Sequence, residues 1–426
     1  MRYLYNVLFY LTLPWLFLRL LWRSRKNSAY RQRWRERLGY VSPKSEHCIW
    51  VHAASVGETL AAVPLIKALQ AQYPDLPVLV TNMTVTGSAR TKAAFGDQVI
   101  NSYVPYDAPH IMARFIKLSK PVVAIIMETE LWPNLFATCG KNNIPVIVAN
   151  ARLSAKSFAG YQRIAGMTRD MLTHVATMAV QTQVEADRFI ELGLQPSKAI
   201  VTGNIKFDIE VPADLAEKSK WLREQLGSNR LIWVAASTHA TEEEIILAAH
   251  QRILEKFPQA LLILAPRHPE RFNDVFTLTQ QSGFNVARRS QQDTCTAATQ
   301  VYLGDTMGEL LKMYAVSDVA FVGGSFVQVG GHNMLEAAVL GKPVITGPQL
   351  YNFAEISRSL QAAQGMVVVQ NTDELVEVVL RLLGDENYRA MVGESARRFV
   401  AANRGALAKQ LQYTKVLIDE KLQLAY

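Results

Sequence analysis

Short apolar runs alternate with longer amphipathic stretches along most of the chain from His47 onward. In the first half, the apolar runs have the length and composition of buried strands, at residues 49–54, 78–82, 99–105, 122–127, 146–149, 178–181 and 200–202. Amphipathic stretches such as residues 58–73 and 131–142 lie between them. Parallel strands need long crossover connections, which are usually helices. The alternation therefore predicts a parallel sheet with helices on both faces.

The same pattern restarts after a polar segment that contains Pro212. A second set of strands is predicted at residues 231–236, 261–265, 300–303, 319–322 and 343–346. We therefore predict an α/β protein with two doubly wound domains, which fits a chain of 426 residues. The predicted division is an anchor segment at 1–40, a first domain at 41–203, a linker at 204–228, a second domain at 229–405 and a terminal helix at 406–426. The sequence leaves open whether that helix packs back on the first domain.

The N-terminal stretch of residues 3–22 is almost wholly apolar. A helix of this length is about 30 Å long, which matches the hydrocarbon core of a bilayer. We predict that it spans or enters a membrane deeply. The alternative is a helix that lies flat in one leaflet. A secretory signal peptide is disfavoured because no small-residue cleavage site follows the apolar run.

Charge sharpens this picture, because the net charge of +8 belongs to one end of the chain. The first forty residues carry nine Arg or Lys and one Glu, whereas the remainder has 36 basic and 36 acidic residues. A basic segment just after an apolar helix predicts that the following domains are cytoplasmic, and it suits anionic lipid headgroups. A nucleic-acid-binding protein would carry its basic patch on the folded body, so that class is set aside.

The sequence offers little for metals or disulfides. Its three cysteines form no CxxC pair, and its eight histidines show no metal-ligand spacing. No acidic pair of the DxD type is present to hold a metal–diphosphate. We therefore expect no cofactor and no metal.

Ligands of doubly wound sheets bind at the carboxyl ends of the strands, so the residues there are the candidates. The most informative stretch is residues 323–336, GGSFVQVGGHNMLE, which follows an apolar strand and precedes a predicted helix. Glycines and free N–H groups at such a turn form an anion site. The alternative is a tight turn with structural glycines. Neither a Walker A motif nor GxGxxG is present, which disfavours an ATPase or a dehydrogenase.

Other strand ends carry further candidates, and each also has a structural interpretation. Glu58 follows the first strand as a possible general base or as an ordinary helix-start charge. Glu128 and Glu130 follow strand 122–127 and are either a functional pair or helix-start acids. Lys206 lies near the predicted domain junction, where it either faces a cleft or extends into solvent. Arg267 has the geometry to bind a phosphate.

Taken together, these motifs resemble the Kdo (3-deoxy-D-manno-octulosonic acid) transferases of lipopolysaccharide assembly. The matching segments, in chain order, are HAASVGE from His52, METELWPN from Met127, ANARLS from Ala149, GNIKFD from Gly203, STH from Ser237, PRHPERF from Pro266, GDTMGEL from Gly304, and the GGS and GGHN segments of 323–336. Eight motifs in order are specific. The departures are small and lie at variable positions, namely Asn204, Ile205 and Met334.

The resemblance implies a GT-B fold of two Rossmann-like domains that face a cleft. It also implies CMP-Kdo as donor and a lipid A precursor (lipid IVA) as acceptor at the cytoplasmic face of the inner membrane. By motif, Glu58 is implied as the proton acceptor, with Glu128 and Lys206 as transition-state stabilisers. The implied CMP site comprises Pro266, Arg267, Met307, Gly308, Glu309, Asn333, Met334, Leu335 and Glu336.

Two rival functions remain at this stage. One is a GT-B enzyme that uses a UDP-sugar, and a preference for CMP over UDP distinguishes the two. The other is an inactive membrane-tethered binding module, which the presence of Glu58 together with the phosphate-binding candidates disfavours. A single displacement would invert the anomeric centre of the donor.

Overall fold

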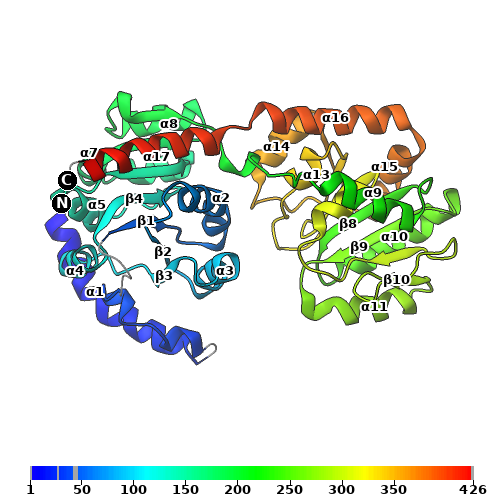
Figure 1. Ribbon diagram of the computed structural model, residues 1–426, viewed down its shortest axis with the longest axis horizontal. Coiled ribbons are helices and arrows are strands. Elements are labelled where there is room, and N and C mark those ends of the chain that lie inside the picture. The colour runs from blue at the N-terminus through cyan, green and yellow to red at the C-terminus, as the bar shows by residue number, and fades with distance from the viewer. Residues whose placement is uncertain (1, 26–27, 42–46, 424–426) are drawn as a thin grey trace. The chain divides into compact units, whose positions relative to one another are not determined.

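The computed structural model describes residues 2–25, 28–41 and 47–423. It divides into two compact units (Figure 1). Unit 1 comprises the described residues up to Asp208 together with those from Arg404 onward, and unit 2 comprises Ile209–Asn403. The chain therefore passes from unit 1 to unit 2 and returns to finish in unit 1.

Unit 1 is built on a seven-stranded, wholly parallel sheet with the strand order β3-β2-β1-β4-β5-β6-β7. The strands are β1 (Cys48–His52), β2 (Val78–Asn82), β3 (Ile100–Tyr103), β4 (Pro121–Met127), β5 (Val146–Ala151), β6 (Val175–Val180) and β7 (Ala199–Val201). Each strand predicted in the first half is present, with ends that differ by a few residues.

The helices of unit 1 follow the strands in alternation. They are α1 (Arg2–Arg23), α2 (Val56–Gln72), α3 (Val85–Phe95), α4 (Pro109–Ser119), α5 (Pro133–Lys141), α6 (Ala155–Gln162), α7 (Ala165–Thr173), α8 (Gln183–Glu191) and α17 (Ala406–Gln423). Short 3₁₀ turns are η1 (Ser28–Arg31), η2 (Glu36–Leu38), η3 (Pro196–Lys198) and η4 (Ile205–Phe207).

Alternate residues of the central strands pack on opposite faces of this sheet. Trp50 and Ile126 belong to one apolar cluster, whereas Val51 and Ile125 belong to another. All residues of β1 and β4 are buried because helices cover both faces. The second cluster includes Ile418 of the terminal helix, so the last helix of the chain completes the core of the first unit.

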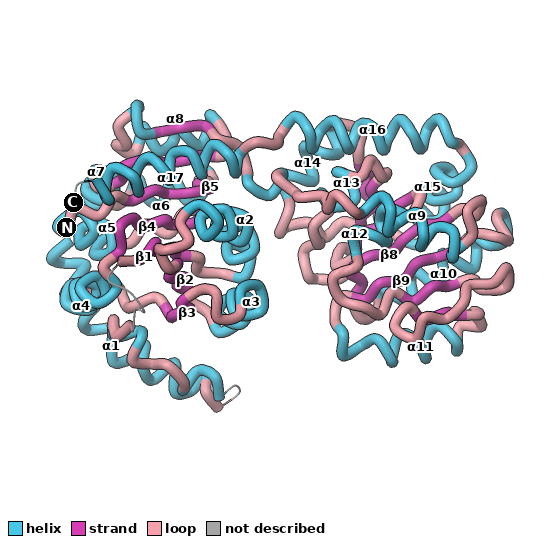
Figure 2. The backbone as a smooth tube through the Cα atoms, in the orientation of Figure 1, coloured by secondary structure: helices cyan, strands magenta, loops and turns pink. Residues whose placement is uncertain are grey.

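Unit 2 repeats this architecture with a second seven-stranded parallel sheet, whose strand order is β10-β11-β9-β8-β12-β13-β14 (Figure 2). Its strands are β8 (Ile232–Thr238), β9 (Leu261–Pro266), β10 (Val286–Arg288), β11 (Val301–Leu303), β12 (Val319–Val322), β13 (Val344–Thr346) and β14 (Met366–Val368). The two strands that the apolar pattern did not predict, β10 and β14, are three-residue edge strands.

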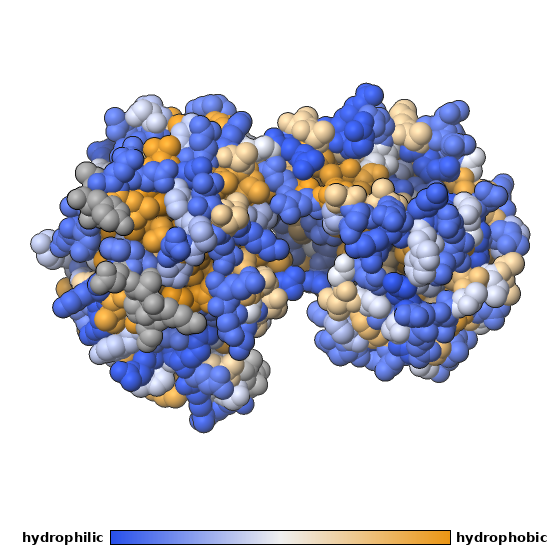
Figure 3. All heavy atoms as spheres, in the orientation of Figure 1, coloured by the Kyte–Doolittle hydropathy of each residue, from blue (hydrophilic) through white to orange (hydrophobic). Residues whose placement is uncertain are grey.

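The helices of unit 2 are α9 (Leu215–Leu226), α10 (Glu242–Lys256), α11 (Phe272–Gln281), α12 (Leu310–Val316), α13 (Leu335–Val339), α14 (Ala354–Ala362), α15 (Thr372–Gly384) and α16 (Glu386–Ala402), with a 3₁₀ turn η5 (Pro269–Arg271). Two doubly wound parallel sheets confirm the predicted fold class. On the face shown in Figure 3, hydrophilic residues cover most of unit 2, whereas larger hydrophobic areas are visible on unit 1.

Helix α1 is long and apolar enough to cross a membrane, and no other described helix passes that test. The basic residues after it do not all belong to a membrane-facing segment. Arg37 is buried and donates to the carbonyl oxygen of Met83. Arg33 binds the carboxylate of Glu36 at 2.7 Å and the carbonyl oxygen of Asn101. The expectation that the whole basic segment meets lipid headgroups is wrong for these two arginines.

Each sheet has one switch point, where strands that were added on one side of its first strand begin to be added on the other side. In unit 1 this point lies between β1 and β4, and in unit 2 it lies between β8 and β12. The loops that leave these strands diverge to opposite faces of the sheet, which opens a crevice at the carboxyl edge. Of the predicted residues, Glu58 follows β1, Glu128 follows β4, and the 323–336 stretch follows β12.

Candidate active site

Glu58 lies in the first turn of α2, directly after β1. Ser55 is the N-cap residue and accepts from the Glu58 amide, while its hydroxyl donates to Glu58 Oε1 at 2.7 Å. Glu58 Oε2 accepts from the Ala54 amide at 2.8 Å. The sequence therefore folds this carboxylate back onto the start of its own helix, where it accepts from the N-cap hydroxyl and from the amide one residue before the N-cap. The structural role considered for Glu58 is real, and it holds the side chain in one place.

Burial raises the pKa of the Glu58 carboxyl, and the negative charge of Glu128 adds to this effect. The hydrogen bonds from Ser55 and Ala54 act in the opposite direction. A carboxylate with a raised pKa is a stronger base than a solvated one. This environment suits proton abstraction from a hydroxyl group.

Glu128 follows β4, the strand next to β1. Its backbone adopts the left-handed conformation, with φ of 56°, which is unusual for a residue with a side chain. Its carboxylate is largely buried and accepts from Arg152 Nε at 2.8 Å, and Lys206 Nζ lies 3.9 Å from Oε1. Arg152, the arginine of the ANARLS motif, is therefore a partner of Glu128.

Lys206 lies in η4, which is held to the first unit by the side chain of Asn150. The Ile205 amide donates to Asn150 Oδ1 at 3.0 Å, and Asn150 itself has a left-handed φ of 53°. Burial lowers the pKa of the Lys206 ammonium, while the charge of Glu128 raises it. The side chain is only 24% exposed, so Lys206 turns toward the carboxylates and does not extend into solvent.

Glu130 is a third carboxylate of this group, and the motif resemblance gave it no role. It accepts a hydrogen bond from Trp132 Nε1 at 2.8 Å. Burial, together with the charges of Glu58 and Glu128, raises its pKa to about 7. Three carboxylates with one lysine and one arginine thus meet at the switch point of the first sheet. The METE sequence after a buried strand was the available signal.

In unit 2, the glycine-rich turn after β12 is already occupied by an anion from the chain itself. The backbone amides of Gly324, Ser325 and Phe326 all donate to the carboxylate of Glu242, at 2.7–2.9 Å. A Cβ at Gly323 would lie 2.8 Å from the carbonyl oxygen of Ser237, so glycine permits the close approach of two strand ends. The expectation that this part of the stretch holds a ligand anion is therefore wrong.

A cluster of histidines does assemble beside it, from three neighbouring strand ends. His239 follows β8, His268 follows β9 and His332 follows β12. The rings of His239 and His332 stack at 5.0 Å with their Nε2 atoms 2.7 Å apart, and His268 lies edge-on to His239. Burial and the charge of Arg267 lower the pKa of His332 to about 3. The sequence motifs contained these histidines, but no role was inferred for them.

Arg267 is the predicted phosphate ligand, and it lies at the end of β9 directly after Pro266. Its amide donates to the carbonyl oxygen of Thr238 at 2.9 Å, which fixes the backbone. Its guanidinium makes no hydrogen bond or ion pair with any residue that the structure describes. The charge of Arg267 affects both His332 and Glu336, which places these side chains in one electrostatic neighbourhood. A half-buried guanidinium with free donors can bind a phosphate.

The end of the glycine-rich stretch, residues 333–336, lies in the same neighbourhood. Asn333 Nδ2 donates to Glu336 Oε1 at 3.0 Å, and burial raises the pKa of Glu336. Met334 and Leu335 are fully buried, so only their backbone is available to a ligand. Helix α13 has five residues, which makes its dipole a weak source of charge stabilisation.

The third predicted segment, Met307 to Glu309, lies at the carboxyl end of β11, the strand beside β9. Glu309 forms a two-point contact with Arg289 at 2.9 and 3.0 Å, and Lys312 Nζ lies at 2.8 Å. These partners lower the pKa of Glu309 to about 2. Its carboxylate therefore shapes the loop, while Met307 and the left-handed Gly308 are exposed.

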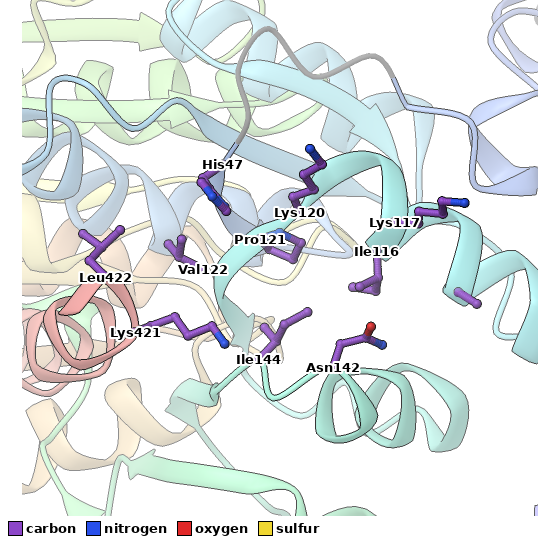
Figure 4. A pocket seen from close by; sticks show the side chains of 11 residues that line it. His47, Ile116, Lys117, Lys120, Pro121, Val122, Asn142, Ile144, Lys421 and Leu422 are labelled. Carbon is purple, nitrogen blue, oxygen red and sulfur yellow. The ribbon is translucent and has the colours of Figure 1, made fainter. Parts of the chain in front are cut away.

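A cavity of about 450 Å³ lies at the opposite edge of the first sheet (Figure 4). It is bordered by the end of α4, the start of β4 and the end of α17, and contains none of the predicted site residues. Lys117, Lys120 and Lys421 surround an apolar floor that includes Ile144. The cavity is thus separate from the cluster of Glu58, Glu128 and Glu130 at the carboxyl ends of the strands.

Comparison with known proteins supports the motif resemblance. Residues 32–209 match the family model "3-Deoxy-D-manno-octulosonic-acid transferase (kdotransferase)", and residues 218–399 match "Glycosyl transferases group 1". A solved UDP-GlcNAc 2-epimerase from Neisseria meningitidis, bound to UDP-GlcNAc, shares the fold. Its TM-score is 0.56 at 14% identity, covering 86% of this chain and 100% of that one.

Two curated relatives match over almost their whole length. The 3-deoxy-D-manno-octulosonic acid transferase of Haemophilus influenzae is 44% identical, with 94% of each chain covered. The 3-deoxy-D-manno-octulosonic acid transferase of Bordetella pertussis is 35% identical, covering 85% of this chain and 86% of that one. These matches, together with the eight motifs and the two doubly wound units, show that the chain belongs to the 3-deoxy-D-manno-octulosonic acid (Kdo) transferase family of glycosyltransferases.

Proposed function

We propose that the protein transfers Kdo from CMP-Kdo to a hydroxyl group of a lipid A precursor, lipid IVA, with inversion at the anomeric carbon. The observation that carries the proposal is the group formed by Glu58, Glu128 and Lys206 at the switch point of a sheet in a Kdo transferase. A sugar hydroxyl is a weak acid, so a positioned base is required as it attacks.

Glu58 is the proposed base. Its two oxygens are held by Ser55 and Ala54, so the carboxylate does not need to be ordered when the acceptor binds. Lys206 and Glu128 are the proposed stabilisers of charge in the transition state. The anomeric carbon of Kdo bears a carboxylate and acquires oxocarbenium character as CMP departs. A negative charge near the oxocarbenium-like carbon and a positive charge near the carboxylate would therefore lower the barrier.

Unit 2 is the proposed donor site. The guanidinium of Arg267 would bind the phosphate of CMP, with the neighbouring imidazoles as further donors. Glu336, held by Asn333, would accept from the ribose hydroxyls. Pro266, Met334 and Leu335 would contribute backbone groups, as would Met307, Gly308 and Glu309 in the adjacent loop. The proposed reaction needs no metal, because arginine and lysine supply the positive charge.

The acceptor is a lipid, so the enzyme must work at a membrane. We propose the cytoplasmic face of the inner membrane, with α1 as the attachment. The apolar composition of α1 and the exposed arginines that follow it support this location. The carboxylate group of unit 1 would then act on a hydroxyl group close to the lipid surface.

The direct test is a reconstituted reaction. Purified protein is mixed with CMP-Kdo and lipid IVA in detergent, and the product is weighed by mass spectrometry. We expect the acceptor mass to increase by whole Kdo units, with activity unchanged by a chelator. Absence of a Kdo adduct would refute the proposal. In a thermal-shift panel CMP should stabilise the protein and UDP should not; the reverse order would favour a UDP-sugar enzyme.

A further inference from the structure

Helix α1 is fastened to the folded body by polar side chains on one of its faces. Tyr5 Oη donates to Asp107 Oδ2 at 3.0 Å, in the loop before α4. One residue further, Asn134 Nδ2 of α5 donates to Asn6 Oδ1 at 2.8 Å. Asp107 also accepts from the amide of Asn134 at 3.0 Å, so the same carboxylate binds α1 and caps α5.

These contacts continue along the helix. At the N-terminal end, Arg2 pairs with Asp170 of α7 at 3.5 Å. Two turns after Arg2, the ring of Tyr10 stacks on His110 at 5.5 Å, and near the other end Phe17 packs edge-on to Tyr106 at 5.5 Å. The helix therefore lies along the body over most of its length, with contacts from Arg2 to Phe17.

The opposite face of α1 is apolar and exposed. Its side chains follow helical spacing, and each is more than half exposed: Tyr3, Leu4, Val7, Leu8, Leu11, Trp15, Leu18, Leu21 and Trp22. We call these nine residues the apolar face of α1. An apolar stripe of this extent marks an interaction site, because leaving it in water costs free energy.

This two-sided arrangement conflicts with a helix that spans the bilayer. A helix of 22 residues is about 33 Å long and would need lipid around it over its whole length. Its first turns would then lie at the far side of the membrane from the body. They would lose Asp170, Asp107 and Asn134, and would leave Asn6 in hydrocarbon without its partner.

We propose, on the basis of the membrane function above, that α1 lies in the plane of the membrane with its apolar face in one leaflet. Both of its ends then stay on the side of the body. The partner is a lipid surface with anionic headgroups, because Arg19, Arg23, Arg25, Arg31 and Arg35 are exposed at and after the C-terminal half of the helix.

The arrangement has a consequence for the proposed active site. Asn134 follows Trp132 by two residues, and Trp132 donates to Glu130 in the carboxylate group. The loop that carries Glu128 and Glu130 is therefore fixed by the same helix, α5, on which the membrane-bound helix rests. Binding of α1 to the lipid surface therefore fixes the distance of these carboxylates from the membrane. The acceptor hydroxyl must reach the carboxylates at that distance.

The side on which residue 2 lies decides between the two topologies. In a Cys295→Ser background of the full chain, whose remaining cysteines Cys48 and Cys139 are buried, Arg2→Cys and Glu420→Cys are made as single variants. Each is labelled with a membrane-impermeant maleimide in inverted and in right-side-out inner-membrane vesicles. We expect both introduced thiols to react in the same vesicle type. Reaction of the Arg2→Cys variant only from the opposite side would overturn the proposal.

Vesicle binding tests the partner. Purified protein is floated with phosphatidylcholine vesicles, with or without phosphatidylglycerol. We expect the anionic vesicles to bind at least tenfold more protein, and Leu11→Glu to reduce this binding at least tenfold. Met391→Glu, a matched change of a half-exposed apolar residue in unit 2, should bind as the unmodified chain does. Equal binding of Leu11→Glu and the unmodified chain would show that the apolar face docks something other than lipid.

The reconstituted reaction separates this inference from the proposed function. Leu11→Glu should retain Kdo transfer to lipid IVA in detergent, where no bilayer has to be bound. Transfer in detergent, combined with labelling of the Arg2→Cys variant from the far side of the membrane, would refute only the in-plane helix. Correct topology and lipid binding without any Kdo transfer would refute only the proposed function.

Discussion

At the scale of single residues, Glu58 combines two roles, and a single substitution removes both at once. It caps α2 and is also the proposed base, so loss of activity in a variant could reflect loss of the helix start. Unit 1 contains a comparable residue, since Glu185 lies in the first turn of α8, is as buried as Glu58 and forms a capping box with Thr182. The pair allows the chemical and structural roles to be separated.

We expect Glu58→Gln to lower kcat by at least a thousandfold, because glutamine cannot accept the proton from the acceptor hydroxyl. Glu185→Gln should retain most of the activity. Both should lose about 1 kcal/mol of stability from the weakened hydrogen bonds at the start of their helices. The measurements are steady-state kinetics and chemical denaturation. Near-normal turnover by Glu58→Gln would remove it as the base.

Glu130 should make stability depend on pH in a defined window. Its pKa in the folded protein is raised to about 7 from an ordinary value of 4.5. The folded state therefore favours the protonated form, and its stabilising effect is lost as pH rises from about 4.5 through 7. Glu130→Gln keeps the contact with Trp132 but cannot ionise. Its stability relative to the unmodified chain should rise across this window by up to about 3 kcal/mol. A difference that stays constant with pH would contradict the assignment.

Arg267 is expected to supply much of the affinity for CMP, because its guanidinium has no partner among the described residues. A hydrogen-bonded charge pair contributes about 1.5–3 kcal/mol, so Arg267→Ala should weaken CMP binding by roughly ten- to a hundredfold. Isothermal titration calorimetry measures this directly. Arg252→Ala, which removes an exposed ion pair with Asp373, serves as the control. Equal affinities in the two variants would exclude Arg267 from the site.

At the scale of elements, the connection between β12 and α13 shows how a glycine-rich turn can serve the fold before it serves a ligand. The buried carboxylate of Glu242 accepts from His239, Gly324, Ser325 and Phe326. It therefore ties the start of α10 to the turn after the neighbouring strand. The three histidines and Arg267 lie on the strand ends beside this link between α10 and the turn after β12.

Glu242→Gln should loosen that turn, because an amide oxygen cannot replace two charged acceptor oxygens. We expect a local loss of about 3 kcal/mol, which is roughly a hundredfold in the opening equilibrium of the turn. Hydrogen exchange followed by mass spectrometry should show faster exchange in peptides that cover residues 323–331. Glu244→Gln, an exposed glutamate in the same helical turn, should exchange at the unmodified rate. Slow exchange in both variants would show that Glu242 is dispensable.

The positions of the strand ends could be predicted from the sequence more reliably than the contacts that the residues at those ends make. Periodicity located the long buried strands, and the rule for parallel sheets placed Glu58 and Glu128 at one edge. It missed β10 and β14, since three-residue edge strands have too little apolar pattern. The Glu242 contact joins residues more than eighty positions apart, and the contacts of α1 join residues about a hundred apart. Such long-range pairs leave no local signal in one sequence.

At the scale of the whole molecule, the C-terminal helix belongs to the unit that the N-terminal half of the chain builds. Gln410 of α17 accepts from the Asn150 amide and donates to Thr202, and Asp208 accepts from the amides of Gly405 and Leu407. Asn150 accepts from the Ile205 amide of η4, and Asp208 directly follows η4, the turn that carries Lys206. The last helix thus supports one of the proposed catalytic side chains.

Truncation after Asn403 should therefore destabilise unit 1 and spare unit 2. It removes the fully buried Ile418 and leaves the buried amide of Asn150 without its partner, Gln410. We expect the calorimetric transition of unit 1 to fall by about 10 °C or more. The transition of unit 2, identified by its upward shift with CMP, should stay within about 2 °C of its value in the full chain. A fall of the CMP-sensitive transition by the same amount would show that α17 supports both units. Loss of Kdo transfer with CMP binding retained would trace the defect to η4 and Lys206.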